Sequence, residues 1–211
     1  MARCWHIRLA LSAMVFALAH TATSQVPSDL PSDPSAFVQK LYAEVIRYQP
    51  LGILDYEYVG HPERKIVNGY GARKRFMPYL SQVLRHRIAV HDACMRDWDW
   101  QYHNANPPLK GPSFEGGIFS GSDERGGPDQ FQIETVQGTS SGPFQVIVRL
   151  SSPPDPAKRD VWRVKVILVR NDDHIGVDDV LYLHGADDPR GDYRLTKYLS
   201  AGCKGPHWGG P

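Results

Sequence analysis

The sequence predicts an α+β domain in which helices cover one face of an antiparallel sheet. Two observations lead to this fold class. Apolar residues recur at helical spacing before residue 95, and they alternate with polar residues in four runs after residue 129. The connections between these runs are short enough for hairpins, so the four strands should form a meander. One face of such a sheet is apolar, and the two amphipathic helices are expected to cover it.

The first helix is predicted to begin at Asp33, which can cap it, with Pro34 at its first position. Its apolar stripe consists of Phe37, Val38, Leu41, Tyr42, Val45 and Ile46. A second helix is predicted to start near Pro78 and to end at Cys94. Its buried face should contain Leu80, Val83, Leu84, Arg87, Ile88, His91 and Cys94. Residues 51–71 indicate a long loop, and residues 103–129 are rich in Asn, Pro and Gly and indicate irregular structure.

The strands are predicted from strict alternation of apolar and polar residues. The apolar members are Phe131 and Ile133 in the first run, Phe144, Val146, Val148 and Leu150 in the second, Trp162, Val164, Val166 and Leu168 in the third, and Ile175, Val177, Leu181 and Leu183 in the fourth.

The amino-terminal residues predict export. Arg3, His6 and Arg8 precede an apolar run at residues 9–19, and small residues follow at 22–24. The run is short for a transmembrane helix, so we expect cleavage near Gln25, the alternative being a retained signal anchor. The predicted organisation is a signal peptide at 1–24, a linker at 25–34, a single domain at 35–203 and a tail at 204–211.

Charge and hydropathy argue against nucleic-acid binding and against membrane insertion, respectively. The chain has 24 basic and 23 acidic residues, and removal of the leader takes Arg3 and Arg8, so 22 against 23 leaves a net charge of −1. A nucleic-acid-binding protein normally shows a marked basic excess, so we predict no nucleic-acid partner. No later segment is apolar enough to span a bilayer, so no membrane insertion is expected after cleavage.

The cysteines are consistent with an oxidising compartment. Cys4 lies in the predicted leader, which leaves Cys94 and Cys203 to form a disulfide. Closing a loop of about 110 residues would stabilise the fold by roughly 4 to 5 kcal/mol in the simple entropic treatment. The bond would hold the segment with Tyr193, Leu195 and Leu199 against the second helix.

Several of these features resemble one exported family. The leader, the stripe from Phe37 to Tyr48, the helix start Pro78-Tyr79-Leu80-Ser81 and the late motif Ile175-Gly176-Val177-Asp178-Asp179-Val180 are similar to the family catalogued as domain of unknown function 3828. Ile175 stands where that family's pattern has Trp. The resemblance covers residues 35–203 and implies a cystatin-like cone of the nuclear-transport-factor-2-like superfamily, with two or three helices on a four-stranded meander.

Asp179 is the candidate catalytic residue. Strict alternation places it on the same face as Ile175, Val177 and Leu181, where an apolar cone would favour its protonated form and could poise it as a general acid or base. The alternative is a buried aspartate that backbone N–H groups or an arginine satisfy. Asp178, on the other face, is expected to be solvated.

Other site candidates are fewer. Trp98, Trp100 and Tyr102 could line a pocket for a sugar or a cation, or could close the end of the second helix as an aromatic plug. No zinc, calcium, nucleotide or nucleophile motif occurs, so we predict neither a metal nor a cofactor.

Three functional hypotheses follow from these observations. The leading one is an exported small binding protein of unknown ligand, either an inhibitor or an immunity-type partner. The second is a cone-fold isomerase or dehydratase that uses Asp179, because the resembled superfamily includes such enzymes. The third is an envelope accessory protein that contacts another protein through Arg149, Arg163 and Lys165 on the solvent-facing side of the sheet.

Overall fold

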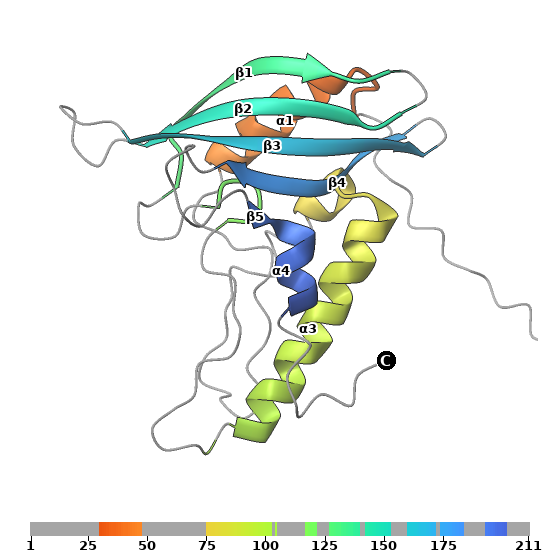
Figure 1. Ribbon diagram of the computed structural model, residues 1–211, viewed down its shortest axis with the longest axis vertical. Coiled ribbons are helices and arrows are strands. Elements are labelled where there is room, and N and C mark those ends of the chain that lie inside the picture. Colours follow the sequence, from red (N-terminus) through yellow and green to blue (C-terminus); the bar gives the residue numbers. More distant parts are fainter. Residues whose placement is uncertain are drawn as a thin grey trace, which may run out of the picture.

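The computed structural model describes residues 30–47, 75–102, 104, 117–121, 127–139, 142–152, 160–171, 174–183 and 193–201. Within these ranges the chain forms helices and one antiparallel sheet, which confirms the predicted α+β class (Figure 1). The helical elements are α1 (Pro34–Arg47), the 3-10 turn η1 (Met77–Tyr79), α3 (Gln82–Tyr102) and α4 (Leu195–Ala201). The predicted leader lies outside the described residues. None of the helices described here has the length and hydropathy of a membrane span.

The sheet is a meander, as predicted, but it has five strands instead of four. The strands are β1 (Gln130–Gln137), β2 (Phe144–Ser152), β3 (Asp160–Asn171), β4 (His174–Leu183) and β5 (Tyr193–Arg194), in this spatial order. β5 has only two residues, so it is too short to show alternation in the sequence.

Helix α1 begins where the sequence predicted. The Asp33 carboxylate accepts a hydrogen bond from the Ala36 N–H at 2.8 Å, and Pro34 occupies the first helical position. Five residues of the predicted stripe are buried: Phe37, Val38, Leu41, Tyr42 and Val45. Leu30, in the predicted linker, packs against the same core, so the folded region begins before residue 35.

Helix α3 differs from the prediction at both ends. Pro78 belongs to η1, and α3 starts at Gln82, because Ser81 caps it by accepting the Leu84 N–H at 3.0 Å. The helix continues to Tyr102, so Cys94 lies within it and not at its end. Val83 and Arg87, predicted on the buried face, are exposed, whereas Leu84, Ile88 and His91 are buried as predicted.

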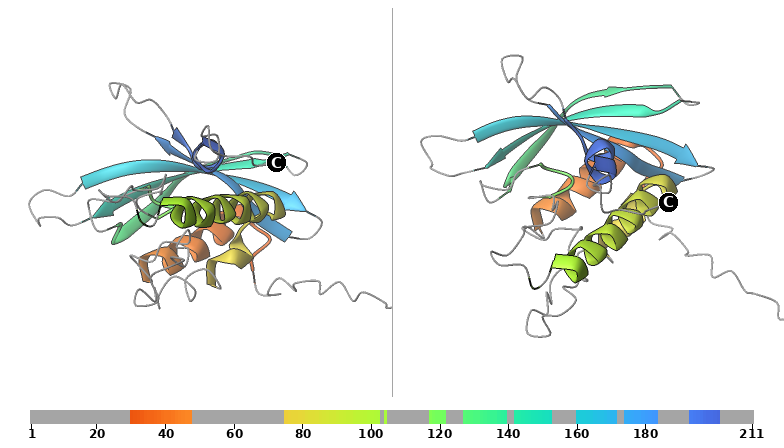
Figure 2. Two further views of the ribbon diagram at one scale, coloured as in Figure 1. Left: turned by 90° about the horizontal axis from the view of Figure 1, so that it is seen from below. Right: turned by 60° about the horizontal axis from the view of Figure 1, so that its bottom comes forward.

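The two faces of the sheet have different roles. We call the face with Val146, Val148, Val164 and Val166 the helix-covered face, because these fully buried valines share one core with the apolar stripe of α1. Figure 2 shows α1 and α3 on the same side of the sheet. The opposite face, which we call the outer face, presents Ile147, Arg149, Arg163 and Lys165.

Helix α4 extends from the short β5 edge of the sheet and lies beside α3 (Figure 1). Leu195 and Leu199 are buried in the core, and the Tyr198 ring lies 5.7 Å from the His91 ring of α3. The prediction that this carboxy-terminal segment packs against the second helix is therefore confirmed.

Candidate functional site

The segment from Ile175 to Val180 contains a β-bulge that the alternation pattern did not reveal. On β3, Leu168 pairs with Val177 and the preceding Ile167 pairs with Asp179, so Asp178 has no partner residue opposite it. The extra residue reverses the side-chain direction along the rest of β4. Val180 and Tyr182 therefore join Val177 in the core, and Asp179 lies on the outer face with Leu181. The prediction that Asp179 shares a face with Ile175 and Val177 is wrong for this reason.

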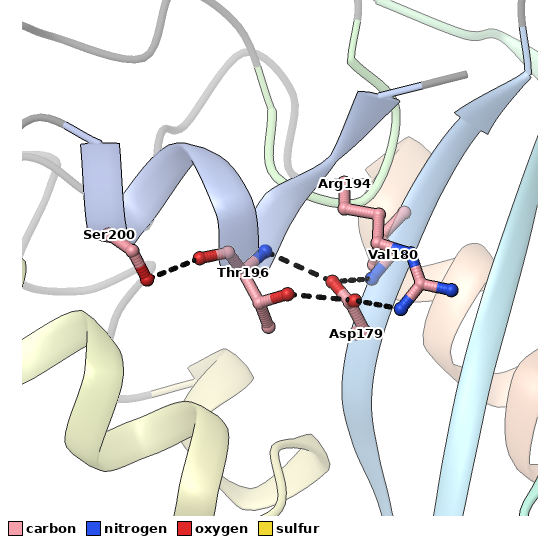
Figure 3. Close-up of polar contacts among 5 residues, drawn as sticks. All are labelled: Asp179, Val180, Arg194, Thr196 and Ser200. Carbon is pink, nitrogen blue, oxygen red and sulfur yellow. Dashed lines mark hydrogen bonds and ion pairs between the residues drawn. The ribbon is translucent and has the colours of Figure 1, made fainter.

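The Asp179 carboxylate is buried beneath the start of α4 (Figure 3). Its Oδ1 accepts the backbone N–H groups of Val180 at 2.9 Å and of Thr196 at 3.0 Å. Its Oδ2 accepts the Thr196 hydroxyl at 2.9 Å and lies 3.6 Å from the Arg194 guanidinium. Because Thr196 is the second residue of α4, Asp179 supplies the cap that the start of this helix requires.

Asp178 has the same kind of role at the other helix, although the sequence predicted it to be solvated. Its Oδ1 accepts a hydrogen bond from the Ser81 hydroxyl at 2.7 Å, and Ser81 is the residue that caps α3. Asp178 is half-buried as a result. Two adjacent carboxylates at the bulge are thus bound to the starts of two different helices.

Gly176 allows α3 to approach the sheet closely. A Cβ atom at this position would lie 2.8 Å from the backbone nitrogen of Ser81. That nitrogen donates a hydrogen bond to the Val177 carbonyl at 2.8 Å, next to a parallel bridge between Leu80 and Val177. Val177, Asp178 and Asp179 therefore each bind the start of a helix, and Gly176 leaves room for one of them, so all four residues have structural roles.

The core between α1 and the sheet has its own polar contacts. The Tyr42 hydroxyl donates to the Phe119 carbonyl and the Tyr182 hydroxyl donates to the Ile118 carbonyl, each at 2.7 Å. Burial raises the pKa of both hydroxyls well above the usual value, which keeps them protonated donors. Both tyrosines are engaged in fixing the segment at residues 117–121 to the core.

The three predicted pocket aromatics do not form one cluster. Trp98 and Tyr102 pack together with their ring centroids 4.5 Å apart, and both are half-buried. Trp100 lies on a different side of α3 and is 66% exposed. Because residues 98 and 102 are one helical turn apart and residue 100 is not, the helix separates Trp100 from the other two. The packed pair is closer to the predicted plug than to an open pocket.

The structure describes only one of the two cysteines of the predicted disulfide. Cys94 is buried on α3, whereas Cys203 lies outside the described residues. No group of three or more His, Cys, Asp or Glu side chains that could hold a metal ion occurs in the described part of the chain.

His91 is a buried titratable group that the sequence placed only on an apolar stripe. Its Nδ1 atom has no hydrogen-bond partner within the described ranges. Burial lowers the pKa of His91, and the negative charge of Asp92 and a hydrogen bond to the Leu199 backbone oppose this shift. Burial also raises the pKa of the neighbouring Tyr198 to about 12. Burial at the α3–α4 contact therefore favours the neutral form of this histidine.

The outer face carries most of the described charge on the sheet. Arg149 of β2 lies directly opposite Arg163 of β3, and Lys165 follows two residues along β3. Arg163 binds Glu134 in a bidentate ion pair at 2.7 and 3.0 Å, and these bonds lower the pKa of Glu134. Arg149 and Lys165 form no ion pair with any of the described carboxylates.

The chain matches no family model, no curated protein and no solved structure. Its placement in the exported family that it resembles therefore stays a proposal.

Proposed function

We propose that the chain is an exported binding protein, of the inhibitor or immunity type, that acts by contacting a partner. The observation that supports this proposal best is the environment of Asp179. Both of its carboxylate oxygens are engaged by Thr196, and it lies on the sheet face opposite the core formed with α1. A general acid or base must reach a substrate proton with a free lone pair or proton, and this carboxylate is committed to a helix start.

The fold that we propose is the cystatin-like cone of the resembled family. A curled antiparallel meander with α1 on its helix-covered face is compatible with that fold. In the enzymes of the resembled superfamily the catalytic carboxylate faces the cavity between sheet and helices. The β-bulge at Asp178 turns Asp179 away from that side, so the enzyme hypothesis loses its candidate residue.

Export and the disulfide belong to the same proposal. A signal peptide at residues 1–24 would deliver the domain to the periplasm or the medium, where Cys94 and Cys203 can pair. The buried position of Cys94 on α3, near the contact with α4, is compatible with a bond to a cysteine just after α4.

Photo-cross-linking in the exporting cell tests the binding function. A photoreactive amino acid is placed at Val161 on the outer face or at Val90 on α3, both of which are exposed. We expect a product of one defined mass from at least one position, and we expect Asp179→Asn to retain it wherever that variant is folded. Absence of a product from both positions would count against a binding protein.

A turnover assay tests the rival enzyme. The purified exported chain is incubated with a small-molecule extract of its host, and mass spectrometry follows the consumption of each component. We expect no component to be consumed. A conversion that Asp179→Asn slows by about two to four orders of magnitude would establish an enzyme and refute the proposal.

A further inference from the structure

We propose that the outer face of β2 and β3 is a docking surface for an acidic segment of a partner protein. This inference rests on the proposed binding function and assigns it a surface and a partner chemistry. We call the surface the basic patch and define it by Arg149, Val161, Arg163 and Lys165, with Ile147 beside them.

The first argument is the arrangement of like charges. Arg149 and Arg163 are direct cross-strand neighbours, and side chains so placed have Cβ atoms about 5 Å apart. Like charges directly opposite each other destabilise a sheet. Glu134 forms its bidentate ion pair with Arg163 and lies within the electrostatic reach of Arg149, so one carboxylate faces two arginines.

The second argument is the balance of charge over the whole outer face. Its described cations are Arg149, Arg163, Lys165 and Arg194, and its described carboxylates are Glu134 and Asp179. Arg163 engages the first carboxylate, and α4 with Arg194 engages the second. Four described cations therefore face two described carboxylates, and neither Arg149 nor Lys165 forms an ion pair with them, although the charge of Arg149 acts on Glu134.

The third argument is the apolar surface around these cations. Ile147 pairs with Lys165 on the same face and is half-buried, as is Ile167 further along β3, while Val161 is 43% exposed. Apolar side chains framed by charged ones are typical of a protein interface, in which the charges select the partner and the apolar contacts exclude water.

The chemistry of the patch favours carboxylates on a protein. Arginine forms planar bidentate bonds with a carboxylate, as Arg163 does with Glu134. A polybasic membrane site needs about four to eight lysines or arginines together, and the patch has three. The chain is nearly neutral overall, unlike a nucleic-acid-binding protein. A second copy of this chain that docked through the same patch would place its own arginines against these, and the like charges would repel.

Binding of a defined acidic probe tests the proposal. The probe is a fluorescent 16-residue peptide of alternating glutamate and alanine, and anisotropy is measured with the full exported chain at low and at physiological salt. The patch variant is Arg149→Gln with Lys165→Gln. The matched control is Arg87→Gln with Arg96→Gln, which removes the same charge from exposed positions on α3.

We expect salt-dependent binding that the patch variant weakens by about three- to tenfold and the control by less than about twofold. The patch variant should melt no lower than the wild type, because it removes the opposition between Arg149 and Arg163. Equal losses in both variants, or no binding to the peptide, would overturn the proposal. So would tighter binding of the patch to vesicles of phosphatidylcholine and phosphatidylglycerol at 3:1, or to a 20-nucleotide DNA.

Cross-linking separates this inference from the function on which it rests. A product from Val161 that disappears in the patch variant supports the docking surface. A product from Val90 alone overturns the surface and leaves the binding function standing. If neither position gives a product, both the docking surface and the binding function are refuted.

Discussion

Replacing Asp179 with asparagine isolates the electrostatic part of the contact between β4 and α4. The change preserves side-chain volume and one acceptor oxygen, so the Val180 and Thr196 N–H bonds at Oδ1 can survive. It substitutes an NH₂ group for Oδ2, which accepts the Thr196 hydroxyl and faces Arg194 at 3.6 Å. The threonine hydroxyl can rotate and become an acceptor, whereas the guanidinium can only donate.

Two losses determine the expected destabilisation. A negative charge at a helix start contributes about 0.3 to 1 kcal/mol when exposed and up to about 2 kcal/mol when partly buried. The ion pair with Arg194 contributes between about 0 and 1 kcal/mol, since the arginine side chain is 58% exposed. Because the Asp179 side chain is only 7% exposed, the upper part of the first range applies, and we expect Asp179→Asn to lower the free energy of unfolding by about 1 to 3 kcal/mol. For a domain of this size this corresponds to about 2 to 4 °C in Tm per kcal/mol.

Urea denaturation of the purified chain, followed by circular dichroism, measures this loss. Asp97→Asn is the matched control, because Asp97 is exposed on α3 and its replacement should change stability by less than about 0.5 kcal/mol. A double-mutant cycle with Thr196→Val should show coupling, since both changes act on one hydrogen bond. A higher Tm for Asp179→Asn would refute the capping role, because it would mean that the charge is strained where it lies.

Three further predictions concern other contacts. Because burial lowers the pKa of His91, this residue binds more protons in the unfolded chain than in the folded one as pH falls below 6.5, so stability should fall with it. Urea titrations of His91→Gln should show a smaller loss of stability at low pH than those of the wild type. The exposed control His86→Gln should lose as much stability as the wild type. Gly121→Ala should destabilise by more than about 1 kcal/mol in the same titration, since Gly121 has φ +66° and a Cβ would lie 2.4 Å from the Tyr182 ring. Non-reducing peptide mapping of exported chain should join Cys94 to Cys203, and two free thiols would contradict that pairing.

The sequence predicted the fold class because its patterns are regular where the structure is regular. The cap at Asp33 and the stripe of α1 are local features, and local chemistry determines both. The meander follows from short connections between alternating runs. The sequence predicted the start of α3 too early, near Pro78, because proline suits the first turn of a helix. In the structure the hydrogen bonds of Ser81 place the start at Gln82.

The candidate site could not be predicted to the same extent. Alternation assigns faces only while the period of two continues, and Ile175 to Val180 contains no glycine or proline at the bulge itself to signal the interruption. The residues next to Asp179 in the sequence were compatible with both predicted roles, a catalytic acid or base and a buried aspartate satisfied by hydrogen bonds. The choice of a helix cap depended on Thr196, which lies 17 residues further along the chain. Tertiary contacts of this kind leave no local pattern.

The hydrogen bond between Ser81 and Asp178 also has a consequence for the order of synthesis. The two residues are 97 positions apart, so the segment that forms α3 is complete long before the residue that holds its start has been made. Asp178 belongs to β4, which pairs with β3 in the folded sheet. The amino-terminal half therefore cannot complete this contact before β4 has been synthesised. The export that we propose would suit a protein built in this way, because β4, the fourth of its five strands, carries the residue that holds the start of its earlier long helix.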